Sequence, residues 1–307
     1  MDQADVLQGC GAGEVRTIQP LVTVVIVCLN EGPQLQHTVE SFRATSPPGT
    51  EIVVVDDGSS DGCTDFLEHG ETNARLVRTT RCGVPHARNH GARAATGQVL
   101  AFADAHVIAP SQWTQPILDA LATPGVGAAA PAVYDLNNPV AKGFGFQLSL
   151  PALDPTWLSQ RGTTPYAVPT LPGCCFAIRR EVFDAVGGFD EGMIHWGMED
   201  SELGLRLWLL GYDLLLVPRV EFGHLFRGVL PYDVTRGCII HNKLRLAFLH
   251  FDRSRIERIV DALSPDRDFA SGLALLAEGD VTSRAAGLRR RRVRDDSWFF
   301  ERFGHFD

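Results

Sequence analysis

The sequence lacks a hydrophobic run long enough to cross a membrane. Its longest clean apolar stretch, VTVVIVCL at residues 22–29, has the length of a strand, whereas a membrane helix needs roughly 18 residues or more. The first residues, MDQADVLQGCGAGE, contain neither the basic region nor the apolar region of a signal peptide. From these absences we expect a cytoplasmic protein without a transmembrane segment.

The sequence also lacks paired cysteines and an excess of positive charge. Its seven cysteines are scattered and form no CxxC pair, which favours reduced thiols over a disulfide framework or a zinc ribbon. A net charge of −9 argues against a general nucleic-acid binder. The exception is RRRRVR at 289–294. Such a run is usually a solvated face, and the alternative is contact through Arg289–Arg294 with an anionic partner or a membrane surface.

What the sequence does contain is an alternation of strands and helices that starts at Leu21. Buried strands are predicted over LVTVVIVCL, EIVVVD, ARLVRTT and VLAFADAH, with helical patterns after the first and before the last. This alternation predicts an α/β fold with a Rossmann-like, mainly parallel sheet flanked by helices. Ligands of such sheets bind beyond the carboxyl ends of the strands. Asn30-Glu31, Asp56-Asp57 and Asp104-Ala105-His106 are expected at that edge.

The second half of the chain is less regular. A strand, a helix and a glycine turn are predicted over 172–193, followed by an amphipathic helix with Leu203, Leu207 and Leu210 inward. The next strand ends in His224, and the pattern after residue 240 is helical. We therefore expect a flexible tail at 1–20, a domain at 21–240 and a helical C-terminal extension at 241–307. The extension ends in aromatic residues, which favour packing over a ligand platform: Trp298, Phe299, Phe300, Phe303 and Phe306.

Asp104 and His106 end a buried strand two residues apart. With a bend in the backbone, both side chains can face one ion. A mixed oxygen and nitrogen ligand set suits Mn²⁺, whereas Mg²⁺ prefers oxygen alone. The alternative is that Asp104 caps the following turn and that His106 is a half-buried surface residue. The pair alone does not decide between these interpretations.

Six segments in order carry a resemblance to a known family. They are IVCLNEG, EIVVVDDGSSD, RCGVPHARNHGARAATGQVLAFADAH, PGCCFAIRREVFDAVGGFDEGM, WGMEDSELGLRLWLLG and GHLFRGVLPY. Together they resemble the GT-A glycosyltransferases of families 2 and 27, most closely the catalytic domain of polypeptide N-acetylgalactosaminyltransferases. The resemblance covers residues 23–232, and it implies a nucleotide-binding half at 21–125 and an acceptor-side half at 126–240.

The resemblance implies a role for individual residues. Asp104, His106 and His224 match the ligands of a Mn²⁺ ion, with Mg²⁺ as the alternative, that bridges the diphosphate of a UDP-sugar donor. Trp196, Arg227 and Tyr232 match a loop that closes over the donor. Further contacts to the donor are implied for Leu29, Asp56, Asp57, Arg81, Ala105 and Gly173.

The sequence departs from this family at its expected catalytic pair. Glu199-Asp200 stands where the retaining transferases have Glu-Asn, and a carboxylate can take the proton of an acceptor hydroxyl whereas an amide cannot. Asp200 therefore favours inversion, and the alternative is that Asp200 or Ser201 only caps the following helix. Cys174 replaces a family glycine near the sugar, so the identity of the sugar is not implied. Val27 and Leu29 replace polar contacts to the base.

We therefore expect a metal-dependent transferase that moves a hexose or N-acetylhexosamine from a UDP-sugar to a hydroxyl, with Ser or Thr of a peptide as the favoured acceptor. An alternative is an inverting family-2-like enzyme that extends a glycan or a lipid-linked sugar. Another is a binding module that holds the nucleotide sugar without turnover. A nucleotidyltransferase is disfavoured, because the first strand is followed by LNEGP and not by a Gly-rich phosphate loop with a basic residue.

Overall fold

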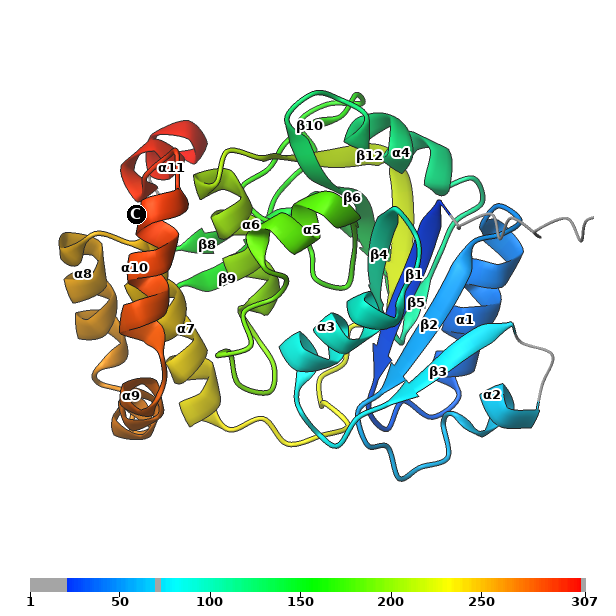
Figure 1. Ribbon diagram of the computed structural model, residues 1–307, viewed down its shortest axis with the longest axis horizontal. Coiled ribbons are helices and arrows are strands. Elements are labelled where there is room, and N and C mark those ends of the chain that lie inside the picture. Colours follow the sequence, from blue (N-terminus) through cyan, green and yellow to red (C-terminus); the bar gives the residue numbers. More distant parts are fainter. Residues whose placement is uncertain (1–20, 70–72, 305–307) are drawn as a thin grey trace, which may run out of the picture.

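The first part of the chain forms a parallel sheet covered by helices. The computed structural model describes residues 21–69 and 73–304, so the tail expected at 1–20 lies outside the described residues, as does Phe306. The elements up to residue 121 are β1 (Val22–Cys28), α1 (Gln34–Thr45), β2 (Glu51–Asp56), α2 (Asp65–His69), β3 (Ala74–Arg78), α3 (Val84–Ala94), β4 (Val99–Asp104), β5 (Val107–Ile108) and α4 (Thr114–Leu121). The strands predicted in this part are all present (Figure 1).

The parallel register explains why polar residues meet at one edge. β1 pairs in parallel with β2 and with β4, so that Cys28 lies beside Asp56 and Val27 beside Asp104. The residues that follow these strands therefore leave the sheet together. Helix α3 lies close against the sheet because Gly91 has no side chain: a Cβ there would lie 2.3 Å from Val25 Cγ1.

The second part of the chain adds strands of both directions. Its elements are β6 (Val126–Asp135), β7 (Asn138–Gly143), β8 (Phe146–Ser149), β9 (Asp154–Trp157), β10 (Tyr166–Ala167), β11 (Cys175–Arg179), α5 (Arg180–Val186), α6 (Glu199–Leu209) and β12 (Asp213–His224). The main sheet has the order β10-β12-β6-β11-β4-β1-β2-β3, with β5 paired to β12 and β7 to β6. Strand β11 is antiparallel to both neighbours, whereas β6 and β12 are parallel. The predicted α/β fold with a mainly parallel sheet is confirmed.

Helix α6 differs from the predicted amphipathic helix. Leu203 and Leu207 are buried as expected, but Leu210 lies beyond the helix and is half-buried. Nearly every residue of α6 is buried, including Glu202 and Arg206. The prediction of a solvent-facing side was wrong because helices of the C-terminal extension cover the side that faces away from the sheet.

The C-terminal extension is helical, as predicted, and forms one end of the molecule (Figure 1). It consists of α7 (Arg236–His250), α8 (Arg253–Leu263), α9 (Phe269–Glu278), α10 (Val281–Arg291) and α11 (Asp296–Phe303). The boundary expected between residues 240 and 241 falls inside α7. Phe299 and Phe300 are buried, and the ring of Trp298 lies 5.8 Å from that of Trp208. The terminal aromatic residues thus pack the extension against α6.

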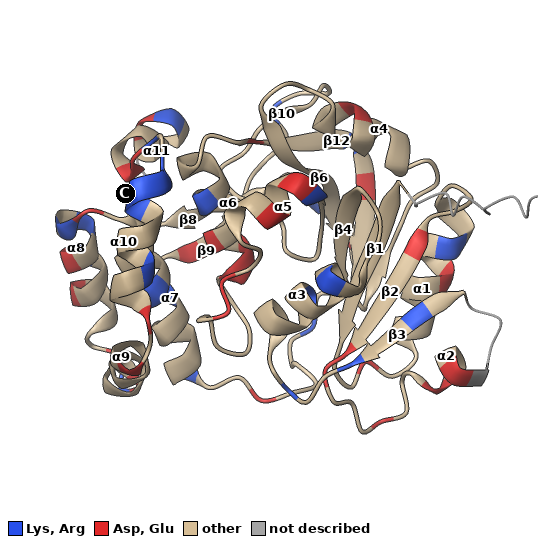
Figure 2. Ribbon diagram, viewed as in Figure 1, with Lys and Arg blue, Asp and Glu red and all other residues tan. Residues whose placement is uncertain are grey.

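The basic run at 289–294 is largely occupied by contacts within the chain. Arg291 bonds the carbonyl of Ala185, and Arg292 bonds that of His250 at 3.0 Å. Arg294 lies over the ring of Trp298 at 4.3 Å. Figure 2 shows the run at the end of α10 that leads to α11. Within the described part of the chain, no helix combines the length and the apolar character that crossing a bilayer requires.

Candidate active site

A cluster of two histidines and one aspartate lies where β4, β5 and β12 meet. Antiparallel pairing of β12 with β5 puts His224 opposite Val107, directly beside His106. Each of Asp104, His106 and His224 offers a ligand atom, and these atoms lie within 4.8 Å of one another. His224 Nε2 is 3.4 Å from Asp104 Oδ2. The structure therefore brings together the three residues that the sequence predicted as metal ligands.

The buried Arg88 of α3 ties this cluster to the carboxylate pair at the start of α6. Its Nη2 donates to Asp104 Oδ1 at 3.1 Å and to the carbonyl of Gly173 at 2.7 Å, and its Nη1 donates to Glu199 Oε1 at 3.2 Å. Burial alone would raise the pKa of Asp104, but the hydrogen bond from His224 and the charge of Arg88 hold it well below its usual range. Arg88 thus keeps a carboxylate ionised in a half-buried position.

Glu199 is buried and Asp200 is half-buried, and Asp200 is not the N-cap of α6. Met198 occupies the N-cap position, so Asp200 is the second residue of the helix. Its Oδ2 accepts from Gly173 N at 3.0 Å and its Oδ1 from Ser201 N at 2.6 Å. Burial and the neighbouring Asp200 raise the pKa of Glu199 to about 7, and burial also raises the pKa of Asp200. A proton-accepting carboxylate at this place is therefore physically reasonable.

Glu31 connects β1 to the segment after β12. Its Oε2 accepts from Arg227 Nη2 at 2.6 Å and lies 3.1 Å from His106 Nδ1. A carboxylate on one nitrogen of an imidazole fixes the ring and leaves the other nitrogen for a ligand. Glu31 therefore orients His106, and it also fixes the position of Arg227.

Asp57 and Asp56 have different surroundings although they are neighbours. Asp57 Oδ1 accepts from Cys82 N at 2.8 Å and Oδ2 from Gly83 N at 2.8 Å, so its carboxylate shapes the loop that carries Arg81. Asp56 is turned the other way, because successive side chains alternate along a strand. Its Oδ1 accepts from Ser59 N at 2.8 Å, and it does not line the site. The structure therefore does not bring Asp56 to the cavity with the other residues expected to contact the donor.

The remaining predicted residues line one cavity of about 680 Å³. Arg81 is exposed, with a positive φ of 52°, and Trp196 is 40% exposed at the rim. Burial raises the pKa of Tyr232. The predicted residues on the cavity wall are Leu29, Asp57, Arg81, Asp104, Ala105, His106, Gly173, Trp196, Glu199, Asp200, His224, Arg227 and Tyr232.

The cavity has two walls of different construction. The strand-end wall consists of Leu29, Asp57, Asp104 and His106, each of which follows or ends a strand. The turn wall consists of residues 195–201 together with α7, which presents Arg236, Ile239 and Lys243 to the cavity. These three positions lie on one face of the helix because of their three- and four-residue spacing.

The cavity is also lined by aromatic side chains. Trp157 is 41% exposed and Phe226 is 40% exposed, and their rings lie 6.0 Å apart in an edge-to-face arrangement. Lys243 Nζ donates to Asp154 Oδ1 at 2.5 Å. The ring of Phe226 also lies 4.3 Å from that of His224, so this aromatic surface borders the ligand cluster.

The sequence predicted that Glu31 lies at the edge of the sheet, but not that it contacts His106 and Arg227. It gave no prediction for Arg88, Trp157 and Lys243. Arg88 gave a usable signal: it lies on the same helical face as Pro85 and Ala92, which are buried. A charged residue on an apolar helix face needs a buried partner of opposite charge. Trp157 and Lys243 gave none, because they are brought to the cavity by β9 and α7, whose positions depend on long-range packing.

Comparisons with known proteins agree with this geometry. Residues 23–187 match the family model "Glycosyl transferase family 2", and residues 159–228 match "N-terminal domain of galactosyltransferase". The first match covers more than half of the chain. The chain therefore belongs to glycosyl transferase family 2.

Individual relatives are longer than this chain. Polypeptide N-acetylgalactosaminyltransferase 11 of Xenopus tropicalis is 32% identical over 92% of this chain and 50% of its own length. Polypeptide N-acetylgalactosaminyltransferase 13 of Homo sapiens is 28% identical over 96% of this chain and 56% of its own length. The chain thus spans about half the length of these relatives.

Two solved structures share the fold. The crystal structure of GalNAc-T7 with UDP, GalNAc and Mn²⁺ superposes with a TM-score of 0.76 at 23% identity, over 93% of this chain and 56% of that chain. The mannosyltransferase PcManGT from Pyrobaculum calidifontis, in complex with GDP-Man and Mn²⁺, has a TM-score of 0.52 at 22% identity, over 89% of this chain and 79% of that chain. The predicted GT-A fold is confirmed by these similarities.

Proposed function

We propose that this protein is a metal-dependent glycosyltransferase that moves a hexose or N-acetylhexosamine from a UDP-sugar to the hydroxyl of a Ser or Thr in a peptide. One observation carries the proposal: Asp104, His106 and His224 form a ligand cluster in the same cavity as the carboxylates of Glu199 and Asp200. The likeness to polypeptide N-acetylgalactosaminyltransferases supports the choice of donor and acceptor.

The ligand cluster fits a divalent cation. His224 Nε2 lies 3.4 Å from Asp104 Oδ2, and Glu31 contacts Nδ1 of His106, which leaves Nε2 of that ring for an ion. One carboxylate and two imidazoles suit Mn²⁺ better than Mg²⁺. When bound, such an ion neutralises the negative charge that builds on the departing nucleotide diphosphate.

The residues around the cluster divide the remaining tasks. We propose that Asp57, Arg81, Leu29 and Ala105 hold the nucleoside, and that Gly173 lets the sugar approach closely. Arg88 holds the Asp104 carboxylate in place through its hydrogen bond. Arg227, which donates a hydrogen bond to Glu31 in this structure, carries a positive charge that can bind the donor phosphates.

Asp200 is proposed to accept the proton of the attacking hydroxyl as the new glycosidic bond forms. Its raised pKa makes it a stronger base than an exposed aspartate. Trp196 and Tyr232 close the cavity around the donor and exclude water. The aromatic surface of Trp157 and Phe226 lines the same cavity, where a peptide acceptor can pack against it.

A second candidate function is favoured by Asp200 itself. A carboxylate on the acceptor side is typical of inverting transferases, which in this family extend glycans or lipid-linked sugars. Inversion predicts that the product has the anomeric configuration opposite to that of the donor. NMR of the product determines the stereochemistry, and the choice of acceptor distinguishes the two candidates.

The test of the proposal is a screen of UDP-sugars with Mn²⁺, with and without Ser- or Thr-containing peptides. We expect UDP release that requires Mn²⁺ and increases with peptide. Release that increases only with a glycan or a lipid-linked sugar supports the second candidate. UDP binding without any release under all conditions would instead indicate a non-catalytic binding module.

We also propose a cytoplasmic location. In the described part of the chain, Cys28, Cys63, Cys82, Cys174, Cys175 and Cys238 are all free, as is usual in reducing compartments. Alkylation of the protein isolated from its native cells should modify these thiols after unfolding without prior reduction. Thiols that react only after reduction would contradict this location.

A further inference from the structure

The turn at residues 194–198 has an unusual backbone. His195 and Met198 have positive φ values of 54° and 73° although neither is glycine, and Gly197 has a φ of 98°. Side-chain-bearing residues adopt this conformation only when the surroundings determine it. The turn therefore needs partners that hold it.

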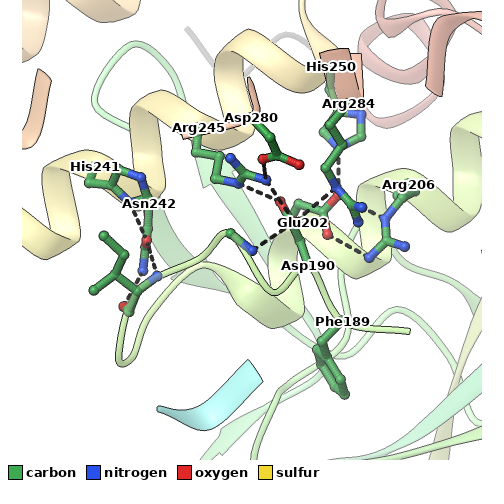
Figure 3. Close-up of polar contacts among 12 residues, drawn as sticks. Phe189, Asp190, Glu202, Arg206, His241, Asn242, Arg245, His250, Asp280 and Arg284 are labelled. Carbon is green, nitrogen blue, oxygen red and sulfur yellow. Dashed lines mark hydrogen bonds and ion pairs between the residues drawn. The ribbon is translucent and has the colours of Figure 1, made fainter. Parts of the chain in front are cut away.

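One partner is Asn242 of α7, which is fully buried. Its Oδ1 accepts from Ile194 N at 2.8 Å, and its Nδ2 donates to the carbonyls of Ile194 at 2.9 Å, Trp196 at 3.3 Å and Gly197 at 2.8 Å. Figure 3 shows Asn242 directed at this segment from α7. A single amide thus bonds both ends of the turn.

The other side of the turn contacts the loop before α3. Val84 N donates to the carbonyl of His195 at 2.7 Å, and a Cβ on Gly83 would lie 2.9 Å from His195 Cα. The turn is therefore held between this loop and α7. Movement of α7 away from the turn would leave three carbonyls without their donor.

Buried charges fix α7 in turn. Arg245 Nε donates to Asp190 Oδ2 at 2.7 Å, and its Nη2 donates to Asp280 Oδ1 at 2.7 Å. Arg284 Nε lies 2.9 Å from Asp190 Oδ1. Figure 3 shows these side chains converging from α7, α10 and the segment before the turn. Because Arg245 and Asp190 are each 1% exposed, breaking this contact would leave an unpaired buried charge.

The turn leads directly into the site. Trp196 forms the rim of the cavity, and Gly197 N donates to Glu199 Oε2 at 2.8 Å. The positions of both side chains depend on the backbone that Asn242 bonds. Asn242 does not line the cavity, but its hydrogen bonds hold the backbone of the turn wall.

We infer that Asn242 is a positioning residue of the C-terminal extension, which fixes the 194–198 turn and through it Trp196 and Glu199. This inference rests on the proposed function for its effect on catalysis, but its structural claim is independent of any activity. The extension is then part of the active-site construction rather than a separate appendage.

The test compares Asn242→Asp with Ile259→Ala. Asparagine and aspartate have the same shape, but aspartate replaces the donor of three hydrogen bonds with an acceptor. Ile259 is a buried residue of α8, so its truncation weakens the extension without touching the turn. Both variants are labelled with 5-fluorotryptophan, and the ¹⁹F signal of Trp196, one of five tryptophans, is assigned with Trp196→Phe.

We expect Asn242→Asp to shift or broaden the Trp196 signal while Ile259→Ala leaves it unchanged. We also expect Asn242→Asp to lower kcat by about a hundredfold, since small misplacements of site residues have effects of this size. An unchanged Trp196 signal in folded Asn242→Asp overturns the inference. Absence of turnover in the wild type overturns the proposed function alone, because the ¹⁹F comparison does not need activity.

Should Asn242→Asp fail to fold, the wild type supplies the second measurement. The Ile194 amide is bonded only to the Asn242 side chain among the contacts described, so it should exchange with solvent as slowly as the core of α7. Fast exchange at Ile194 in an otherwise protected protein overturns the inference.

Discussion

The strand-end wall and the turn wall of the cavity are built in different ways. Asp57, Asp104 and His106 of the strand-end wall follow parallel strands whose register places them at one edge. Trp196 and Glu199 of the turn wall depend on a strained turn that distant helices hold. The comparison teaches that a regular sheet positions a metal cluster by itself, whereas a carboxylate pair and a closing aromatic require tertiary support.

The largest effect is expected from breaking the strand-end wall at its ligands. Asp104→Ala or His224→Ala should abolish Mn²⁺ binding, because each removes one of three protein ligands. Calorimetric titration of Mn²⁺ measures this, and circular dichroism checks the fold. Arg88 keeps Glu199 and the Gly173 carbonyl as partners in the Asp104 variant, so unfolding is not expected. Unaltered Mn²⁺ affinity in both variants would show that the ion is held elsewhere.

The next effect comes from the turn wall. Asp200→Asn should lower kcat by about 10²–10⁴ if Asp200 accepts the proton of the acceptor hydroxyl. If Asp200 serves only the start of α6, Asp200→Asn removes a negative charge from the helix N-terminus, which should cost about 0.3–1 kcal/mol of stability and little rate. Steady-state kinetics and urea unfolding of the same variant separate these outcomes. An unchanged kcat together with lowered stability would remove Asp200 from the mechanism.

The contrast between the walls also explains what the sequence could predict. Alternating strands and helices predicted the sheet, and polar residues at strand ends predicted Asp57, Asp104 and His106. Asp56 does not line the cavity, because successive side chains at a strand end point to opposite sides. Its neighbour Asp57 lines the cavity.

The turn wall was only partly predictable, and its support was not. The motif around Glu199 and Asp200 identified the carboxylates, whereas nothing local indicated that Asn242 would bond a turn more than 40 residues earlier. Helix α6 was expected to be amphipathic, with only one side buried, but helices far along the chain cover its other side. Such contacts depend on tertiary packing, which a local pattern does not encode.

A smaller effect is expected from the buried Glu202, which pairs with Arg206 and with His250 of α7. It is measured as the pH dependence of the unfolding free energy. Burial alone would raise the pKa of Glu202, but the charge of Arg206 and the hydrogen bond from His250 lower it overall. Because the folded state then binds fewer protons than the unfolded state, this contribution is present above about pH 4.5 and is lost as the pH falls further. Below that pH, the unfolding free energy of Glu202→Gln should therefore fall less steeply with falling pH than that of the wild type.

The expected difference in slope is at most about 1.4 kcal/mol per pH unit, the value for one proton. Urea unfolding at several acidic pH values measures it. Glu257→Gln is the matched control, because Glu257 is 60% exposed and pairs with Arg253 on the surface. Equal slopes in the wild type and in Glu202→Gln would contradict the role of this carboxylate.

The smallest effects are expected within the basic run that joins the extension to α6. Arg294 lies over Trp298 at 4.3 Å and donates to the carbonyl of Trp208 at 3.3 Å, so Arg294→Ala should cost about 1–2 kcal/mol. Arg289 is exposed, and Arg289→Ala should change the unfolding free energy by less than about 0.5 kcal/mol. Thermal unfolding compares the two variants at equal net charge. If both variants lose the same unfolding free energy, the loss comes from the removed charge alone. The packing of Arg294 on Trp298 would then not stabilise the contact between the extension and α6.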